Sequence, residues 1–363
     1  MKICFLADAK SIHVKKWVSY FVERNHEVHI ISFRKASVPG AVLHCLPTPF
    51  ALRTMRNLSP FGKLGYLFYL KKARAIVREL SPDILHAHWA TSYGLMGACS
   101  GYHPYILSTW GRDIFDFPRQ SPLHKKLLKY IIRKADLITA TSRMLTDETK
   151  KYVVGEKPVY TIPFGVDLTL FKSKPKKKKN NIIIGIVKSL EKKYGIEYLI
   201  KAFPLVLKAH QNTLLLIIGE GSLKRRLMRL CRRLKIEERV VFTGFIENHR
   251  IPGFINKMDI FIIPSISDSE TFGVAAVEAA ACQLPVIASD IGGLPEVINH
   301  DKTGFLVPPR NPQSIADRVI QLITDTKLRQ RMGKDARRRV REDYDWSQNS
   351  RQMEKLYQTV LKR

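Results

Sequence analysis

Strand-length apolar runs alternate with longer amphipathic segments along most of this chain, and this rhythm limits its fold more than any other feature. Residues 2–7 (KICFLA) and 27–33 (EVHIISF), for example, flank the amphipathic residues 14–25. A strand–helix–strand order of this kind predicts a parallel sheet with helices on both faces. The sequence therefore predicts an α/β fold.

The rhythm is interrupted once and then starts again, which predicts two domains. Residues 172–181 (KSKPKKKKNN) are polar and basic and include a proline, as is typical of an interdomain linker. The chain has 363 residues, enough for about two domains of ordinary size. We predict one Rossmann-like, doubly wound domain over residues 1–171 and a second over 182–343, followed by a helix over 344–363. Ligands bind beyond the carboxyl ends of the strands in such sheets, so we expect a central cleft there.

The charge of the chain predicts an anionic partner. Its formal net charge is +29, which favours nucleic acid, anionic lipid or a phosphorylated substrate without choosing among them. The five cysteines are scattered and show neither a disulfide framework nor zinc spacing, which favours a reducing compartment. No apolar run reaches the ~18 residues that span a bilayer, and the first run is interrupted by Asp8. We expect a cytoplasmic protein, with peripheral attachment to the inner face of a membrane as an option.

Two glutamates, Glu270 and Glu278, stand in the otherwise small and apolar residues 267–293 (SDSETFGVAAVEAAACQLPVIASDIGG). Asp268 or Ser269 could cap a helix that begins near residue 272, and a helix N-terminus suits a diphosphate. The second glutamate would then lie roughly 7.5 Å along the helix axis, about the length of a diphosphate. Each carboxylate could accept hydroxyl hydrogen bonds at one end of that group. In the alternative interpretation, one glutamate is an ordinary first-turn acid and the other pairs on a solvated face.

Several segments, taken together and in order, resemble the retaining glycosyltransferases of family 4, which have the GT-B fold. Residues 267–293 with 301–309 (DKTGFLVPP) resemble the donor-site signature of that family. The resemblance extends over nearly the whole chain and includes the segments IPFGVDLTLF, GIVKSLEKKYGIEYLIKAF, LLIIGEGSLKRRL, VVFTGFI, DILHAHW and STWGRDIF.

The resemblance implies transfer of a sugar from a UDP- or GDP-linked donor to a hydroxyl acceptor, with retention and without a metal or cofactor. Residues 182–343 would hold the nucleotide-sugar, residues 1–171 would face the acceptor, and residues 344–363 would pack back on the N-terminal domain. Glu270 would lie at the donor sugar and Glu278 at the ribose. The backbone at the phosphates and the adjoining turn would come from Thr271, Phe272, Gly273, Val274, Gly219 and Gly221.

Two departures from the family pattern change the expected site. Where the family has an arginine and, five residues later, a lysine at the donor phosphates, this chain has Ser189 and Tyr194. Lys188 and Lys193 stand one residue earlier with the same separation, and we hypothesise that they neutralise the phosphates. The alternative is that Lys193 is a solvated loop charge.

The second departure lies in the N-terminal domain, where Trp110 replaces the usual histidine of the family. Asp113 is then expected to orient the acceptor or the sugar. His13, placed at the end of the first strand, is the preferred histidine of this domain. We expect His86 to make a structural hydrogen bond. A turn at Gly292 and Gly293 could frame the nucleotide or only connect a strand to a helix.

Basic amphipathic segments at residues 121–136 and 64–80 could dock the N-terminal domain on anionic lipid, which would suit a lipid-linked or membrane-proximal glycan acceptor. They could equally be ordinary helices with a core face and solvated lysines. Two rival functions are a nucleotide-sugar epimerase on the same fold and a nucleic-acid-binding protein. The second is disfavoured because the basic residues are spread over both domains. The sequence leaves the donor sugar, the acceptor and the oligomeric state open.

Overall fold

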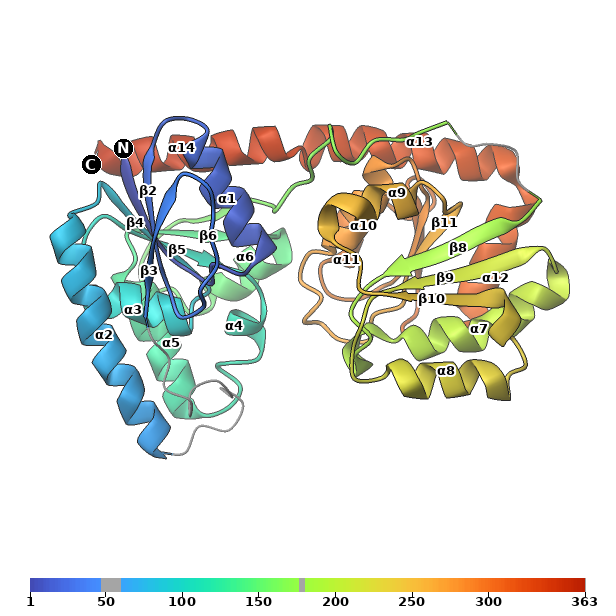
Figure 1. Ribbon diagram of the computed structural model, residues 1–363, viewed down its shortest axis with the longest axis horizontal. Helices are drawn as coiled ribbons and strands as arrows, with labels where there is room; N and C mark the ends of the chain where they lie inside the picture. Colours follow the sequence, from blue (N-terminus) through green and yellow to red (C-terminus); the bar gives the residue numbers. More distant parts are fainter. Residues whose placement is uncertain (47–59, 176–179, 363) are drawn as a thin grey trace. The chain divides into compact units, whose positions relative to one another are not determined.

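The computed structural model describes residues 1–46, 60–175 and 180–362. The chain forms two compact units, drawn in Figure 1. The first contains Met1–Pro163 with Ser350–Arg363, and the second contains Phe164–Asn349. Each unit is built around its own sheet.

The sheet of the first unit has seven parallel strands in the order β3-β2-β1-β4-β5-β6-β7. The strands are β1 Lys2–Leu6, β2 Glu27–Ser32, β3 Ala41–Cys45, β4 Ile84–His88, β5 Tyr105–Thr109, β6 Leu137–Ala140 and β7 Val159–Thr161. The helices are α1 Ile12–Val22, α2 Pro60–Leu80, α3 Ser92–Ser100, α4 Arg112–Phe115, α5 Pro122–Lys134 and α6 Arg143–Lys150, joined by part of α14 Trp346–Leu361.

Alternating side chains of these strands bury both faces of the first sheet. Leu6 and Ala87 belong to a core cluster shared with α2, α3 and α5. Phe5 points to the opposite face, where it contacts Phe21 of α1, and that ring stacks on Tyr357 of α14. Figure 1 shows the same division of the helices about the strands. A strand that is apolar on both faces is the expected result for a parallel sheet covered on both sides.

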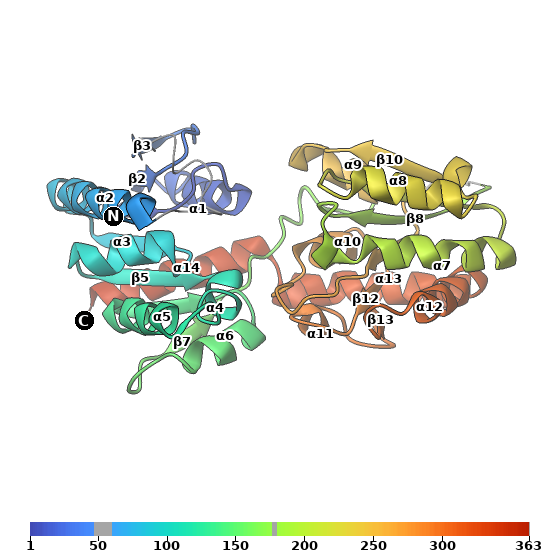
Figure 2. The ribbon, with the colours of Figure 1, turned by 90° about the horizontal axis from the view of Figure 1, so that it is seen from below.

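The sheet of the second unit has six parallel strands in the order β10-β9-β8-β11-β12-β13. Figure 2 shows it running from β10 at one edge to β13 at the other. The strands are β8 Ile182–Val187, β9 Thr213–Ile218, β10 Val240–Gly244, β11 Ile260–Ile263, β12 Val286–Ser289 and β13 Gly304–Val307. The helices are α7 Ile196–Ala209, α8 Lys224–Arg233, α9 Ile251–Ile255, α10 Val274–Ala281, α11 Leu294–Val297, α12 Pro312–Thr324 and α13 Thr326–Asp343.

Both faces of the second sheet are also covered. Ile184 and Ile186 of β8 pack with α7, α8 and α12 in one core cluster. Between them, Gly185 faces the other side, where a Cβ would meet the side chain of Met258 at 2.2 Å. The prediction of two Rossmann-like, doubly wound domains is confirmed.

The strand order of each sheet reverses at one point, and this point determines where a ligand can bind. The reversal lies between β1 and β4 in the first unit and between β8 and β11 in the second. The crevice outside the carboxyl ends of two such strands is the usual ligand site of an open α/β sheet. The loops that follow these four strands are therefore the first place to look for function.

The boundary between the units differs from the sequence prediction. We predicted it at residues 172–181, of which 176–179 lie outside the described residues, but the first unit ends at Pro163. The reason is that the following residues pack within the second unit. Val166 pairs with Asp345, and a Cβ on Gly165 would lie 2.9 Å from the backbone of Trp346. Within the described ranges, we find no helix that is long and apolar enough to cross a membrane.

Candidate functional site

A buried ion pair joins the two loops at the reversal point of the second sheet. Lys188 directly follows β8, and Glu270 lies in the loop after β11. The Lys188 Nζ lies 2.9 Å from Oε1 of Glu270 and 2.8 Å from its Oε2, and Ser265 donates to that Oε2 at 3.2 Å. The two side chains are only 13% and 9% exposed. The pair brings together two residues that the sequence analysis had selected separately.

The Lys188 ammonium stays charged although it is buried. Burial lowers its pKa, but the carboxylate of Glu270, with Tyr194 and Glu278, raises the pKa by more, so that it lies above the ordinary value. Tyr194 also connects the two lysines of the hypothesis. The ammonium groups of Lys188 and Lys193 each lie 4.7 Å from the centroid of its ring. Such contacts are of the cation–π type.

Glycines allow the loops around this pair to pack closely. A Cβ on Gly219 would lie 2.0 Å from the carbonyl oxygen of Lys188, and one on Gly221 would lie 2.5 Å from that of Leu190. Leu190 also donates its N–H to the Glu220 carbonyl at 2.9 Å. These glycines therefore position the loop that carries Lys188, while Ser189 in the same loop is exposed.

The Gly292–Gly293 turn supports the other loop. Gly293 donates its N–H to the carbonyl of Glu270 at 2.8 Å. A Cβ on Gly292 would lie 2.3 Å from that same carbonyl oxygen, and one on Gly293 would lie 2.0 Å from the carbonyl oxygen of Thr271. The turn connects β12 to α11, as one of our two interpretations predicted, and it also packs against the backbone of Glu270.

Helix α10 begins after Gly273, and this corrects the predicted cap. Gly273 occupies the N-cap position with a left-handed backbone, φ 80° and ψ 51°, so neither Asp268 nor Ser269 caps the helix. The Ser269 hydroxyl instead contacts that of Ser267 at 3.0 Å. A Cβ on Gly273 would meet Leu294 at 2.6 Å, which explains the glycine.

The other residues predicted at this helix differ in what they can offer a ligand. Phe272 is buried with its ring against Phe164 and Tyr344, so only its backbone remains for a ligand. Thr271 is buried, whereas Val274 and Glu278 are partly exposed. Glu278 stands on the second turn of α10 and acts electrostatically on Lys188.

In the first unit, an aromatic cluster occupies the corresponding reversal point. His13 lies in the first turn of α1 and not at the strand end where we had placed it. Its ring is edge-on to that of Trp110 at 5.9 Å, and the Trp110 ring lies 4.9 Å from that of His88. The prediction that His13 is the site histidine of this domain stays open. His88, which the sequence did not single out, lies in the same aromatic cluster.

His88 is a buried imidazole without a hydrogen-bond partner among the described residues. The residue is 2% exposed, and neither ring nitrogen has a partner. Burial lowers its pKa to about 3, assisted by the charge of His13. Burial also lowers the pKa of His13 to about 4, assisted by Lys16. Both rings are therefore neutral in the folded protein near neutral pH. No pattern in the sequence distinguished His88 from His86.

His86 behaves as predicted, because it makes structural hydrogen bonds. One ring nitrogen pairs with the hydroxyl of Tyr357 and the other with that of Ser108 at 2.7 Å. Asp113 also has a structural role that we had not expected. Its buried carboxylate accepts backbone N–H bonds from Ala90 at 2.7 Å, Gly111 at 2.7 Å and Trp110 at 3.2 Å. These bonds shape the loop that holds Trp110, and the substrate role expected for Asp113 remains untested.

The neutral His88 predicts a dependence of stability on pH. The unfolded chain binds a proton at His88 below its ordinary pKa of 6.5, while the folded chain does so only near 3. The free energy of unfolding therefore falls as the pH falls between these values. From about pH 6.5 to about pH 5, this one residue should cost about 2 kcal/mol. Denaturant unfolding of wild type and His88→Leu at both pH values measures it.

In that experiment the free energy of unfolding of His88→Leu should fall by about 2 kcal/mol less than that of wild type between the two pH values. The exposed His249 gives a matched control, because His249→Leu should leave the difference between the two pH values unchanged. Equal losses for wild type and His88→Leu would show that His88 is not held neutral in the fold.

The comparisons with known proteins agree with this architecture. Residues 168–339 match the family model described as glycosyl transferases group 1, and residues 2–142 match the one described as glycosyl transferase 4-like. N-acetyl-alpha-D-glucosaminyl L-malate synthase of Bacillus anthracis is 28% identical over 358 residues, covering 94% of this chain and 91% of that protein.

Two solved structures share the fold over 99% of this chain at 20% sequence identity. Sucrose-phosphate synthase from Thermosynechococcus elongatus has a TM-score of 0.84 and is covered over 98% of its chain. HepE from Anabaena is covered over its full length, with a TM-score of 0.81 for the complex with UDP and 0.79 for the complex with UDP-glucose.

Proposed function

The chain belongs to the family 4 glycosyltransferases of the GT-B fold, and from this premise we propose that it moves a sugar from a nucleotide-diphosphate donor to a hydroxyl acceptor. One observation carries the proposal, namely the buried Lys188–Glu270 ion pair between the loops after β8 and β11. An ammonium group held at this edge of the sheet is placed to attract a diphosphate. The carboxylate beside it can accept hydrogen bonds from sugar hydroxyls.

Each proposed donor residue of the second unit would have its own role. Lys188, with Lys193 beyond the Tyr194 ring, would neutralise the diphosphate, most strongly as the leaving group gains charge. Backbone N–H groups at the start of α10 would add to this attraction. Glu270 would hold the donor sugar, and Glu278 would accept hydrogen bonds from the ribose hydroxyls, as carboxylates do in other doubly wound folds.

We propose that the transfer retains the configuration of the anomeric carbon. The bond from this carbon to the phosphate oxygen breaks while a bond to the acceptor oxygen forms on the same face. The acceptor proton passes to the departing phosphate oxygen. This route needs neither a protein nucleophile nor a metal. Proton NMR of the first product gives its anomeric configuration, and an inverted product, or transfer abolished by EDTA, would contradict this part of the proposal.

We propose UDP as the nucleotide, supported by the UDP and UDP-glucose complexes of HepE. A bound ligand raises the melting temperature, and a ligand at a hundred times its Kd stabilises a protein by about 2.7 kcal/mol. In a thermal-shift panel we expect UDP-sugars to raise the melting temperature more than GDP- or ADP-sugars at equal concentration. A larger shift with GDP- or ADP-sugars would identify that nucleotide, and not UDP, as the one in the donor. No shift with any of them would reject a nucleotide-sugar donor.

The acceptor proposed is a lipid-linked or membrane-proximal glycan precursor, and the rival activity is epimerisation of the nucleotide-sugar. The two activities differ in their need for an acceptor. Consumption of a donor only when a hydroxyl acceptor is present would support transfer. Interconversion of the donor sugar without an acceptor would support the epimerase instead.

A further inference from the structure

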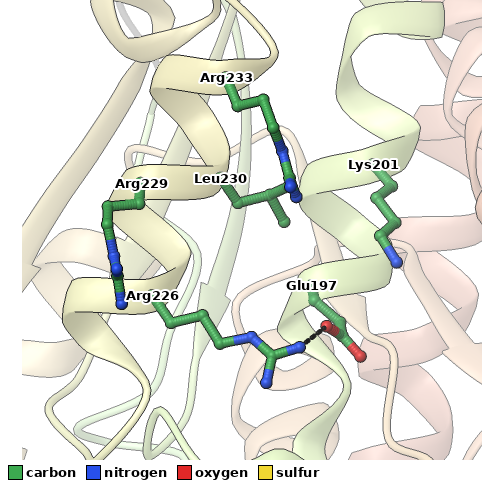
Figure 3. Close-up of a pocket in the computed structure, with 6 residues that line it drawn as sticks. All are labelled: Glu197, Lys201, Arg226, Arg229, Leu230 and Arg233. Carbon is green, nitrogen blue, oxygen red and sulfur yellow. Dashed lines mark hydrogen bonds and ion pairs between the residues drawn. The ribbon is translucent and has the colours of Figure 1, made fainter.

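A basic groove lies between α7 and α8 of the second unit, and none of the residues that line it is among those assigned to the donor. It has a volume of about 360 Å³, and Figure 3 shows side chains from both helices around it. It is lined by Glu197, Lys201, Arg226, Arg229, Leu230 and Arg233. Four of these six residues are cationic and one is acidic, so the groove has a strong positive charge.

Most of this charge is not compensated within the described part of the chain. Arg226 lies 3.4 Å from Glu197, the pair that Figure 3 marks with a dashed line. The Lys201 ammonium lies 5.2 Å from the centroid of the Tyr198 ring. Arg229 and Arg233 make no hydrogen bond or ion pair with any described residue. Two guanidinium groups therefore remain available for an external anion.

The positive charge continues along α8 beyond the groove. Six of the ten residues of α8 (KRRLMRLCRR) are lysine or arginine, and none is acidic. A helix of this length presents its charge over about 15 Å. A stripe of this size suits a partner with many negative groups better than a single small anion.

Exposed apolar side chains stand among these cations on both helices. Met228 is 36% exposed and lies between Arg225 and Arg232, at helical spacings of three and four residues. Leu205 of α7 is 37% exposed and lies between Lys201 and Lys208 in the same way. Cations around exposed apolar side chains are typical of helices that lie in the interface of a membrane.

We propose that this α7–α8 surface, composed of Lys201, Leu205, Lys208, Arg225, Met228, Arg229, Arg232 and Arg233, docks on an anionic phospholipid membrane. The guanidinium groups would contact lipid phosphates, and Met228 and Leu205 would enter the headgroup region. The earlier prediction for residues 121–136 stays open. Leu128, Ile131 and Ile132 of its helix, α5, are buried in the core of the first unit, whereas Leu123 is 72% exposed. The control variant below tests that segment.

Co-sedimentation with vesicles made of equal parts phosphatidylglycerol and phosphatidylcholine tests the proposal. Each basic residue near an anionic surface strengthens binding about fivefold. The variant Arg229→Gln/Arg233→Gln should therefore bind roughly thirtyfold more weakly than wild type at low salt. Adding Met228→Gln to this double variant should weaken vesicle binding further. Vesicles of phosphatidylcholine alone should bind neither wild type nor the variants. Both arginines are exposed, so the melting temperature and the UDP-induced shift should stay unchanged.

The matched control is Lys125→Gln/Lys129→Gln on α5, which removes the same charge from exposed residues of the first unit. It should bind vesicles as wild type does. Equal losses from the two double variants, or no loss from the arginine variant, would overturn the proposal. So would displacement by inorganic phosphate beyond that by chloride at equal ionic strength, since that would indicate a site for a free phosphate. Binding is measured without substrate, so its failure leaves the donor proposal standing.

Discussion

Replacing Lys188 by alanine should lower kcat/KM by roughly two to three orders of magnitude, the largest effect that we expect from one substitution. The ammonium group that neutralises the departing diphosphate is then lost. The carboxylate of Glu270 also loses its partner while only 9% exposed. Removing one member of a buried ion pair costs about 3 kcal/mol or more. Steady-state kinetics and the melting temperature should both show the change.

Two further variants separate the loss of phosphate binding from the loss of stability. Glu270→Gln also breaks the ion pair but keeps the cation, so it should retain affinity for UDP, which Lys188→Ala should lose. Lys193→Ala should weaken the binding of UDP about tenfold. Lys192 lies in the same turn but is exposed, so Lys192→Ala should leave UDP binding unchanged. If Lys188→Ala binds UDP as tightly as wild type does, Lys188 is not part of the donor site.

Replacing Gly292 by alanine should nearly abolish sugar transfer, although this residue is not among those assigned to the donor. Its φ is 61°, and its Cβ would lie 2.3 Å from the carbonyl oxygen of Glu270. The backbone of that loop cannot yield as a flexible side chain can, so Glu270 must shift. We expect at least a hundredfold loss of kcat/KM, since small displacements of catalytic groups cost about this much.

Gly101→Ala is the control, because Gly101 has nearly the same φ, 65°, and no atom within 4 Å of its Cβ position. It should cost only about 1 kcal/mol of stability and leave activity unchanged. If Gly292→Ala and Gly101→Ala behave alike in a transfer assay, the turn does not position Glu270.

The sequence by itself determined the two sheets, because a parallel strand that is buried on both faces is a continuous apolar run in the sequence. The apolar runs at residues 2–7 and 27–33 became β1 and β2 as expected. It also indicated Glu270, which lies just before a predicted helix start, and the resemblance to the family 4 glycosyltransferases indicated Lys188. These inferences need only the residues within one segment.

Only the tertiary structure decided how these residues are used, because the deciding contacts join segments far apart in the chain. Lys188 and Glu270 are 82 residues apart, and their pairing depends on β8 and β11 being neighbours. The start of α10 at Gly273 follows from contact with Leu294, and the burial of His88 follows from Phe5 and Trp110 on other strands and loops. Local periodicity encodes which face is buried, but not which distant side chain will lie against it.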